Sequence, residues 1–411
     1  MHMDKLSWKV PVYAFPVIYL FGFGLSFSNH NGREFVELCG IALFLISALL
    51  GIVFASAAIT KDRRIHWHAS LGLLVSIVLA VFSVLYAWAV VHQYLQPGYQ
   101  PVRKISGDTA SNIWIDTDPA CGFKPNSDAD DCWALVLAFR EKLPIAGIST
   151  VFGNAPIQET YRRAVKITKA LDPTVPVFKG NGRPERNQPD HNKASMALAE
   201  ALRHEHLTIL ALGPLTNIAD VIVNHPDLTK RIERIVMVAG KRPGHLFHPG
   251  KQWWYHFRDF NICLDTPAGQ IVMKSDIPIT LIPFELGSQV AIGTRQLAAL
   301  STGDKINQWL YQQSTAWLAH WQTTIREKTF SPFDSVAVAY LRHPHYYQCM
   351  ETTARIGFNL FLEPFGIGRD LEISRPGRPV RYCYAFNRPI VDHLVATTAA
   401  TPIAIPARHP E

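Results

Sequence analysis

The sequence predicts an α/β fold: an open, mostly parallel sheet with helices on both faces, preceded by transmembrane helices. From residue 112 onward, short apolar runs alternate with amphipathic stretches, a rhythm typical of parallel sheets. The loops after several of these runs collect acidic, amide and glycine residues, as expected where functional loops meet at one sheet edge. Three long apolar stretches near the N-terminus predict the membrane part.

The N-terminal residues 1–95 are predicted to form a membrane region, residues 96–111 a linker, and residues 112–411 one large α/β domain. The linker prediction depends on polar residues interrupted by proline and glycine. The second and third apolar stretches contain 24 and 25 residues, long enough to cross a bilayer as helices. The three predicted spans are Val10–Phe27, Val36–Ile59 and Trp67–Val91.

Lysine and arginine residues predict the orientation of these spans. With three spans, the N-terminus and the second loop share one side, and the cluster KDRR at 61–64 marks that side as cytoplasmic. The large domain is then expected outside the cytoplasm. The net charge of +7 is diffuse, and no basic run with interleaved aromatic residues indicates nucleic-acid binding. The oligomeric state stays open, with a homo-oligomer as one alternative.

The large domain is predicted to contain six apolar strands and five amphipathic helices before residue 283. Runs of Val, Ile and Leu bounded by turn residues indicate the strands, and a helical period of apolar residues indicates the helices. The strands are Ile113–Asp116, Ile145–Val151, Val175–Phe178, Leu207–Leu212, Arg234–Val238 and Ile279–Ile282. The helices are Asp131–Glu141, Ile157–Ala170, Lys193–Arg203, Leu215–His225 and Asp265–Lys274.

The most acidic stretch of the domain follows its first strand. Asp116 and Asp118 come at the carboxyl end of the strand, and Asp128, Asp130 and Asp131 open the next helix. Five neighbouring carboxylates raise one another's pKa, and a hard cation such as Ca²⁺ or Mg²⁺ relieves that repulsion. The alternative is that Asp130 is a helix N-cap and the rest a solvated acidic loop. A cap does not need five acids, so the pattern favours a metal site.

Further polar residues follow the other strands of the predicted sheet. Asn154 follows the second strand, and Leu212 precedes a Gly-Pro turn that exposes backbone carbonyls. A segment rich in aromatic, histidine and glycine residues follows the fifth strand and is typical of a loop that covers a site. Asp334 opens a later helical run. Cys121 and Cys132 flank the acidic loop and could form a disulfide in an oxidising compartment.

In this order, these pieces resemble the inosine–uridine-type nucleoside hydrolase family. The resemblance covers roughly residues 112–345 and leaves the three-span N-terminus outside the family pattern. The family's D-x-D-P-G-x-D-D motif matches Asp116, Asp118, Pro119, Asp130 and Asp131. Further matches are the V-x-G-N turn ending at Asn154, the G-P-L-T-N-I-A run at Gly213–Ala219, the segment Asp259-Phe260-Asn261 to Asp265, and Asp334.

The resemblance implies a hydrolase that cleaves the N-glycosidic bond of ribonucleosides to give ribose and free base, and the predicted spans make it membrane-anchored. It also implies Ca²⁺ as the cofactor, which holds the ribose hydroxyls and the attacking water. Asp118 would accept the proton of that water as general base. The metal ligands would be Asp118, Asp131, Asp334 and the backbone carbonyl of Leu212. The substrate-binding residues would be Asp130, Asn154, Asp259, Asn261 and Phe333.

Some features depart from the family pattern. The loop between Asp118 and Asp130 is longer than in the motif, and Asp259 stands where the family often has glutamate. Trp253 and Trp254 replace a segment in which many members carry asparagine.

The position before Asp334 also differs from the inosine–uridine branch. That branch carries a histidine there, proposed to protonate the leaving base, and this chain has Phe333. An aromatic residue at this position resembles the purine-preferring branch and predicts stacking on a purine, the alternative being a core phenylalanine. Candidate replacement acids and further stacking partners lie in the covering segment: His245, His248, His256, Trp253, Trp254 and Tyr255.

Two other functions were weighed against hydrolysis. A membrane-anchored ribonucleoside sensor could keep the metal and ribose site and lose turnover, but the complete set of site residues favours the enzyme. The D-x-D pattern also resembles haloacid dehalogenase phosphatases. Those enzymes carry threonine or valine where this chain has Ala120, and they have no place for Asp130 and Asp131.

Overall fold

The computed structural model describes residues 74, 77, 81, 102–103, 111–183, 193–242, 245, 259–357, 370–373 and 377–400. The chain divides into two compact units, Met1–Gly98 with Phe358–Gly368, and Tyr99–Gly357 with Arg369–Glu411.

In the first unit, Leu74, Ile77 and Val81 are helical and their side chains are exposed. The rest of the three predicted membrane spans, and most of the predicted linker, lie outside the described residues. Within the described ranges, no helix combines the length and the apolar character that crossing a membrane requires.

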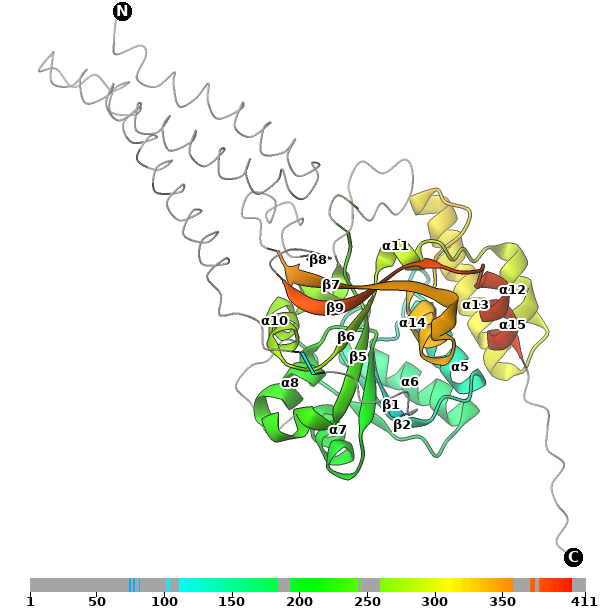
Figure 1. The fold of residues 1–411 in the computed structure, drawn as a ribbon. Coiled ribbons are helices and arrows are strands. Elements are labelled where there is room, and N and C mark those ends of the chain that lie inside the picture. The colour runs from blue at the N-terminus through cyan, green and yellow to red at the C-terminus, as the bar shows by residue number, and fades with distance from the viewer. Residues whose placement is uncertain are drawn as a thin grey trace, which may run out of the picture. The chain divides into compact units, whose positions relative to one another are not determined.

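The second unit contains a mixed, mostly parallel sheet of nine strands (Figure 1). Strands β1 to β6 and β9 run parallel, and β7 is antiparallel to both β9 and β8. The order across the sheet is β3-β2-β1-β4-β5-β6-β9-β7-β8. The strands are β1 Asn112–Thr117, β2 Ile145–Thr150, β3 Val177–Lys179, β4 Leu207–Ala211, β5 Ile232–Val238, β6 Ile279–Ile282, β7 Tyr347–Ile356, β8 Leu371–Ile373 and β9 Arg378–Phe386.

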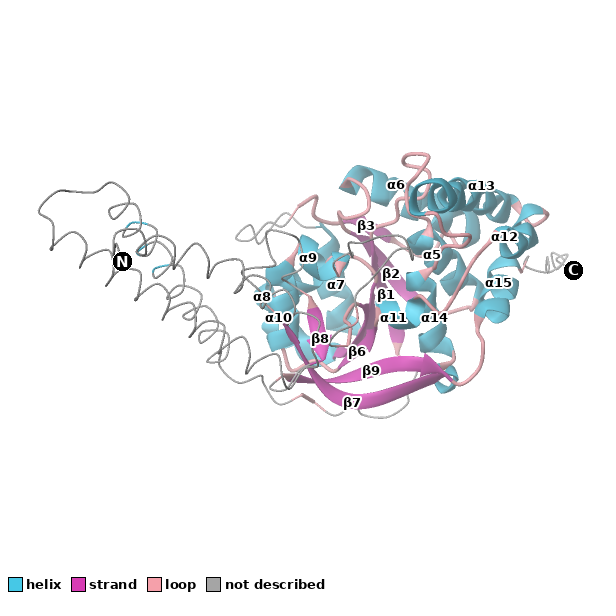
Figure 2. Ribbon diagram, turned by 90° about the horizontal axis from the view of Figure 1, so that it is seen from above, coloured by secondary structure: helices cyan, strands magenta, loops and turns pink. Residues whose placement is uncertain are grey.

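Helices cover both faces of this sheet, as predicted (Figure 2). One buried apolar cluster joins β-strand residues to α5, α6 and α11–α15, and a second joins them to α7–α10. The helices are α5 Asp130–Arg140, α6 Ile157–Leu171, α7 Lys193–His204, α8 Thr216–Asn224, α9 Phe260–Leu264, α10 Thr266–Lys274, α11 Phe284–Gly287, α12 Thr294–Ser301, α13 Lys305–His320, α14 Phe333–Arg342 and α15 Val391–Ala399.

All six predicted strands and all five predicted helices are confirmed, with their bounds shifted by at most two residues. Strands β7 to β9 were not predicted. Tyr347–Ile356 is mostly polar and Leu371–Ile373 is only three residues long, while Arg378–Phe386 begins with two arginines and a proline before its short apolar run. These strands form because β9 pairs with β6 and β7 pairs with β9, and the local sequence pattern does not show that pairing.

Candidate active site

The predicted site residues meet at the carboxyl ends of β1 and β4, next to each other in the sheet. The chain order reverses there, because β1 continues to β2 on one side and β4 to β5 on the other. Ligands of open α/β sheets bind in the crevice at such a switch point. Asp118 follows β1 directly, and Leu212 follows β4.

Four buried carboxylates come together at this point. Asp130, Asp131 and Asp334 each offer a carboxylate oxygen within 4.8 Å of the others. The backbone N–H of Asp118 donates to Asp131 Oδ1 at 3.0 Å, and the Thr117 hydroxyl donates to the same oxygen. All four acids are at most 6% exposed, which excludes the alternative of a solvated acidic loop.

Two helix N-termini supply three of these acids. Asp130 and Asp131 are the first residues of α5, and Asp334 is the second residue of α14. Helix N-termini present unpaired N–H groups and a partial positive charge, which favours carboxylates. Here one such donor is already used, because Asp131 N–H donates to Asp130 Oδ1 at 2.8 Å.

The carboxylate of Asp118 is fixed through one oxygen only. Its Oδ2 accepts the N–H of Asn154 at 2.6 Å, while its buried Oδ1 has no hydrogen-bond partner within the described part of the chain. A buried acceptor left without a partner costs free energy unless a ligand satisfies it. Oδ1 therefore points to a ligand at this position.

Asp116 lies behind the cluster and supports it. Its Oδ1 accepts the hydroxyl of Ser149 and the side-chain N–H of Asn217, the latter at 2.8 Å. Trp114 continues the series by donating its indole N–H to the Ser149 hydroxyl at 2.8 Å. The sequence had indicated Asn217 only as part of the G-P-L-T-N-I-A run, and no pattern had indicated Thr117 or Ser149.

Burial and mutual repulsion raise the pKa of every acid in this region. Burial is the main cause, and it raises the pKa of Asp116 to about 7 and that of Asp131 to about 6. The pKa values of Asp118, Asp130 and Asp334 rise well above the usual range, for the same reason and because neighbouring carboxylates repel. A bound cation would remove both penalties, so the donor set suits a hard divalent ion.

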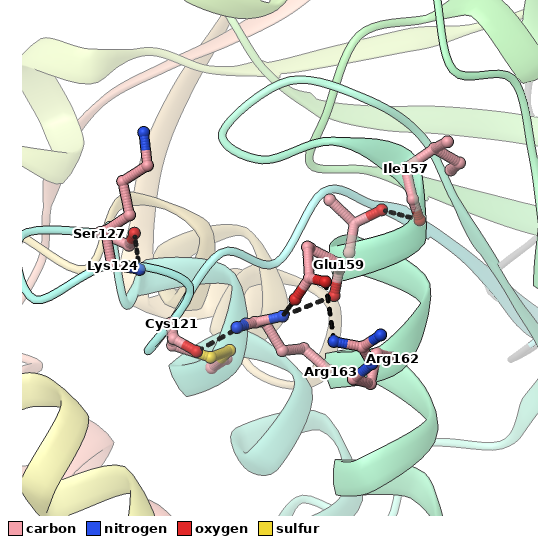
Figure 3. Close-up of polar contacts among 9 residues, drawn as sticks. Cys121, Lys124, Ser127, Ile157, Glu159, Arg162 and Arg163 are labelled. Atoms are coloured by element: carbon pink, nitrogen blue, oxygen red, sulfur yellow. Dashed lines mark hydrogen bonds and ion pairs between the residues drawn. A yellow bond between two sulfur atoms is a disulfide. The ribbon is translucent and has the colours of Figure 1, made fainter.

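The longer loop between Asp118 and Asp130 does not separate the two ends of the motif. A disulfide joins Cys121 to Cys132, as the sequence had suggested, and ties the loop to α5. From α6, Arg163 donates Nε–H to the Cys121 carbonyl at 2.8 Å and pairs with Glu159 at 2.5 Å (Figure 3). Both attachments keep the insertion folded while Asp118 and Asp131 converge.

Asn154 and Asn261 both reach the cluster. Asn154 places its side-chain N–H 3.4 Å from Asp131 Oδ2, in addition to its backbone contact with Asp118. Asn261 donates to the Leu212 carbonyl at 2.8 Å and to the Val238 carbonyl at 3.1 Å. The carbonyl predicted as a metal ligand therefore lies directly beside a predicted sugar-binding side chain.

Asp259 lies at the N-terminus of α9, two residues before Asn261. Its carboxylate accepts the N–H of Ile262 at 3.3 Å and that of Gly240 at 2.8 Å. Burial raises its pKa to about 7. The acid thus joins the loop after β5 to α9 and holds Asn261 at the site.

Phe333 is the first residue of α14, immediately before Asp334, and its ring packs against Gly287. A Cβ built on Gly287 would come within 2.5 Å of Phe333 Cδ1. The ring is only partly buried, so both the stacking and the core interpretation stand. In the predicted cover, Trp253, Trp254, Tyr255, His248 and His256 lie outside the described residues.

Substitution of Gly153 tests the position of the Asp118 carboxylate. A Cβ at residue 153 would lie 1.9 Å from Asp118 Oδ2, so Gly153→Ala must displace that carboxylate. We expect kcat to fall by roughly 100-fold, the size of effect that a misplacement of about 1 Å produces. Gly357→Ala is the control, since its Cβ would meet no atom nearer than 3.8 Å. Equal activity of both variants, measured as release of free base from a ribonucleoside, would contradict this placement.

Known proteins resemble this chain in sequence and in fold. Residues 113–365 match the model of the family described as inosine-uridine preferring nucleoside hydrolase. The non-specific ribonucleoside hydrolase RihC of Klebsiella pneumoniae is 26% identical over 259 residues, which covers 56% of this chain and 79% of that protein.

Solved structures show the same fold. A plant nucleoside hydrolase superposes with a TM-score of 0.59 at 18% identity and covers 71% of this chain and 99% of its own. A purine-preferring ribonucleoside hydrolase from Gardnerella vaginalis gives a TM-score of 0.59 at 18% identity and covers 70% of this chain and 98% of its own.

Proposed function

Because this chain belongs to the inosine-uridine preferring nucleoside hydrolase family and is an N-glycosidase that acts on ribonucleosides, we propose that its carboxylate cluster binds Ca²⁺ and is the catalytic centre. The observation that supports the proposal is the group of Asp130, Asp131 and Asp334, whose carboxylates lie close enough to share one ion, together with the unsatisfied Oδ1 of the neighbouring Asp118. The products are ribose and the free base.

The proposed ligands are the side chains of Asp118, Asp131 and Asp334 and the carbonyl of Leu212. All are oxygen donors, which Ca²⁺ prefers. When bound, Ca²⁺ supplies a Lewis acid that positions ribose hydroxyls and makes a water molecule easier to deprotonate. The Leu212–Gly213 peptide lies close to Asp118, because a Cβ at Gly213 would be 2.8 Å from Asp118 Oδ1.

Asp118 is the proposed general base. Its Oδ2 is held by the Asn154 N–H, which leaves Oδ1 to accept a proton from the attacking water. Burial raises the pKa of Asp118, so its carboxylate holds a proton more strongly than an exposed aspartate does. The surrounding carboxylates also favour the positive charge that develops on the ribosyl group as the bond to the base breaks.

The proposed substrate contacts come from residues that the structure holds rigidly. Asn261 is oriented by its two N–H donations, which leaves its side-chain oxygen to a ribose hydroxyl. Asp130, at the start of α5, is proposed to accept a hydrogen bond from another ribose hydroxyl. Asn154, after β2, is proposed to donate a hydrogen bond to one. Asp259 keeps the loop after β5 in place and is proposed to contact the sugar at its outer side.

Phe333 is proposed to stack on a purine base, which predicts a purine preference. Phe333→Leu keeps an apolar side chain against Gly287 but removes the aromatic face. Stacking on a base contributes about 1–3 kcal/mol, so we expect kcat/KM for inosine to fall on the order of 10-fold or more. The value for uridine should change much less. If both fall equally, or if the wild type strongly prefers uridine, Phe333 is a core residue without a role in base recognition.

The experiment that tests the proposed function is base release from inosine, guanosine, uridine and cytidine by the full chain. Each is measured after removal of divalent ions with a chelator and after addition of Ca²⁺. We expect release only with Ca²⁺, and faster release from the purine nucleosides. Binding of ribonucleosides without release from any of them would instead favour the sensor.

We also propose that residues 1–95 anchor the enzyme in a membrane with the α/β domain outside the cytoplasm. The apolar length of the predicted spans and the KDRR cluster support this arrangement. Two disulfides in the α/β domain, Cys121–Cys132 and Cys349–Cys383, suit an oxidising compartment. Recovery of the full chain in the membrane fraction after alkaline carbonate washing, with its domain accessible to external protease, would support the proposal. A fully soluble protein would overturn it.

A further inference from the structure

A second group of metal-ligating side chains lies away from the carboxylate cluster. Glu141, His343 and His393 each place one ligand atom within 4.8 Å of the others. His393 Nε2 is 2.9 Å from Glu141 Oε1, and His343 Nε2 is 3.3 Å from Glu141 Oε2. His343 and His393 are 202 and 252 positions from Glu141 in the chain, so no local sequence pattern indicated the group.

Helices α5 and α14 each contribute to both groups, one group at each end, and His393 comes from α15. α5 begins with Asp130 and Asp131 and ends next to Glu141, while α14 contains Asp334 in its first turn and ends next to His343. The two helices therefore run parallel. α5 has 11 residues, and a rise of about 1.5 Å per residue separates the two groups by roughly 16 Å.

The backbone holds Glu141 rigidly at this end of α5. Leu143 N–H donates to the Ala138 carbonyl at 3.1 Å and Lys142 N–H to the Phe139 carbonyl at 3.0 Å, the two bonds of a Schellman motif. Lys142 occupies the left-handed position of that motif, with φ of 52°. Glu141 is the C-cap residue, and its side chain is 7% exposed.

The electrostatic environment at this end favours a cation. The C-termini of α5 and α14 both present carbonyl groups and a partial negative charge, to which Glu141 adds a carboxylate. Among the described residues, only the two histidines lie within ion-pair distance of Glu141. In addition, His343 Nε2 is buried and makes no hydrogen bond of acceptable geometry with any described group.

We propose that Glu141, His343 and His393 form a second metal site, which binds Zn²⁺. Two imidazole nitrogens and one carboxylate oxygen are a common zinc ligand set, with the fourth tetrahedral position left to solvent. Tetrahedral bonds of about 2.0–2.1 Å place ligand atoms roughly 3.3 Å apart, so ligand atoms that lie within 4.8 Å of one another need only small side-chain shifts to share one ion. The imidazole nitrogens distinguish this site from the carboxylate cluster. That cluster offers only oxygen atoms, which Ca²⁺ prefers as ligands.

The site is tested by titrating the full chain with Zn²⁺ in the presence of saturating Ca²⁺, which keeps the carboxylate cluster filled. We expect one tight equivalent of Zn²⁺, measured by competition with a chromophoric chelator. His343→Gln and His393→Ala should each lower that affinity on the order of 100-fold, since even residues that only support a ligand change metal affinity by about 10–100-fold. Co²⁺ in place of Zn²⁺ should give visible absorption bands of nitrogen ligation that are lost in both variants.

His204→Ala is the matched control. His204 Nε2 also lies 2.9 Å from a glutamate, Glu200, but on an exposed helix face with one histidine only. This variant should keep the tight equivalent and the Co²⁺ bands. Retained Ca²⁺-dependent base release in the His343 and His393 variants shows that they are folded. Absence of a tight equivalent in the wild type, or its survival in both variants, would overturn the proposal and leave a metal-free glutamate–histidine contact.

Discussion

Asp118→Asn is expected to lower kcat for ribonucleoside hydrolysis on the order of 1,000-fold, within the range of general base catalysis. Asparagine keeps the shape of the side chain and its oxygen can still accept the Asn154 N–H. It cannot accept a proton from water, so turnover is lost while much of the ribonucleoside binding remains. Single-turnover base release and equilibrium binding of inosine, measured on the same preparation, separate the two effects.

Asp128→Asn is the matched control for this variant. Asp128 belongs to the same acidic stretch, and its Oδ1 accepts the N–H of Asp130 at 3.1 Å, which an asparagine oxygen can also do. We expect less than about a 10-fold change in kcat, as no proton transfer is assigned to it. If Asp118→Asn releases base at the wild-type rate, Asp118 is not the base and the proposed chemistry is wrong.

The chelated protein is expected to become less stable as the pH rises from about 5 to 7.5. The folded-state pKa of the buried acids is raised, Asp116 from 3.8 to about 7 and Asp131 from 3.8 to about 6. The folded state therefore binds more protons than the unfolded state across this window, and the free energy of unfolding falls with pH. Across this window, the shift of Asp116 alone corresponds to a loss of about 2.5 kcal/mol.

Added Ca²⁺ is expected to reverse this trend, because the cation binds the ionised carboxylates. At 100 times its dissociation constant, the ion adds about 2.7 kcal/mol to the free energy of unfolding. Chemical denaturation at pH 5.0 and 7.5, with chelator and with Ca²⁺, measures both effects. The chelated Asp116→Asn variant should lose part of the pH dependence. A chelated wild type with equal stability at the two pH values would contradict the raised pKa values.

The place where the candidate site residues meet was largely predictable, because it follows from simple rules of sheet topology. A parallel sheet brings strand ends together, so acids after β1 and a carbonyl after β4 must meet, whatever their distance in the chain. The convergence of Asp118 with Asp131 across the longer loop was harder to foresee, since it depends on the Cys121–Cys132 disulfide and on Arg163 from another helix.

Contacts between residues that are far apart in the chain could not be predicted where they depend on how strands or helices pack. Cys349 and Cys383 are joined because β7 and β9 pair in the register that places them opposite each other, and that register cannot be derived from either strand's own sequence. Glu141 and His393 meet only after α5 and α15 have packed on the same face of the sheet. Nor does a sequence pattern show that the Ser149 hydroxyl donates a hydrogen bond to Asp116.

The series from Trp114 through Ser149 to Asp116 has an optical consequence. The Trp114 indole is 1% exposed and is joined to the carboxylate cluster by two hydrogen bonds, and Trp133 is fully buried two residues after Asp131. Any change in charge at the cluster alters the electric field at these two indole rings. The wavelength and intensity of their fluorescence can therefore report the filling of the centre without an added dye.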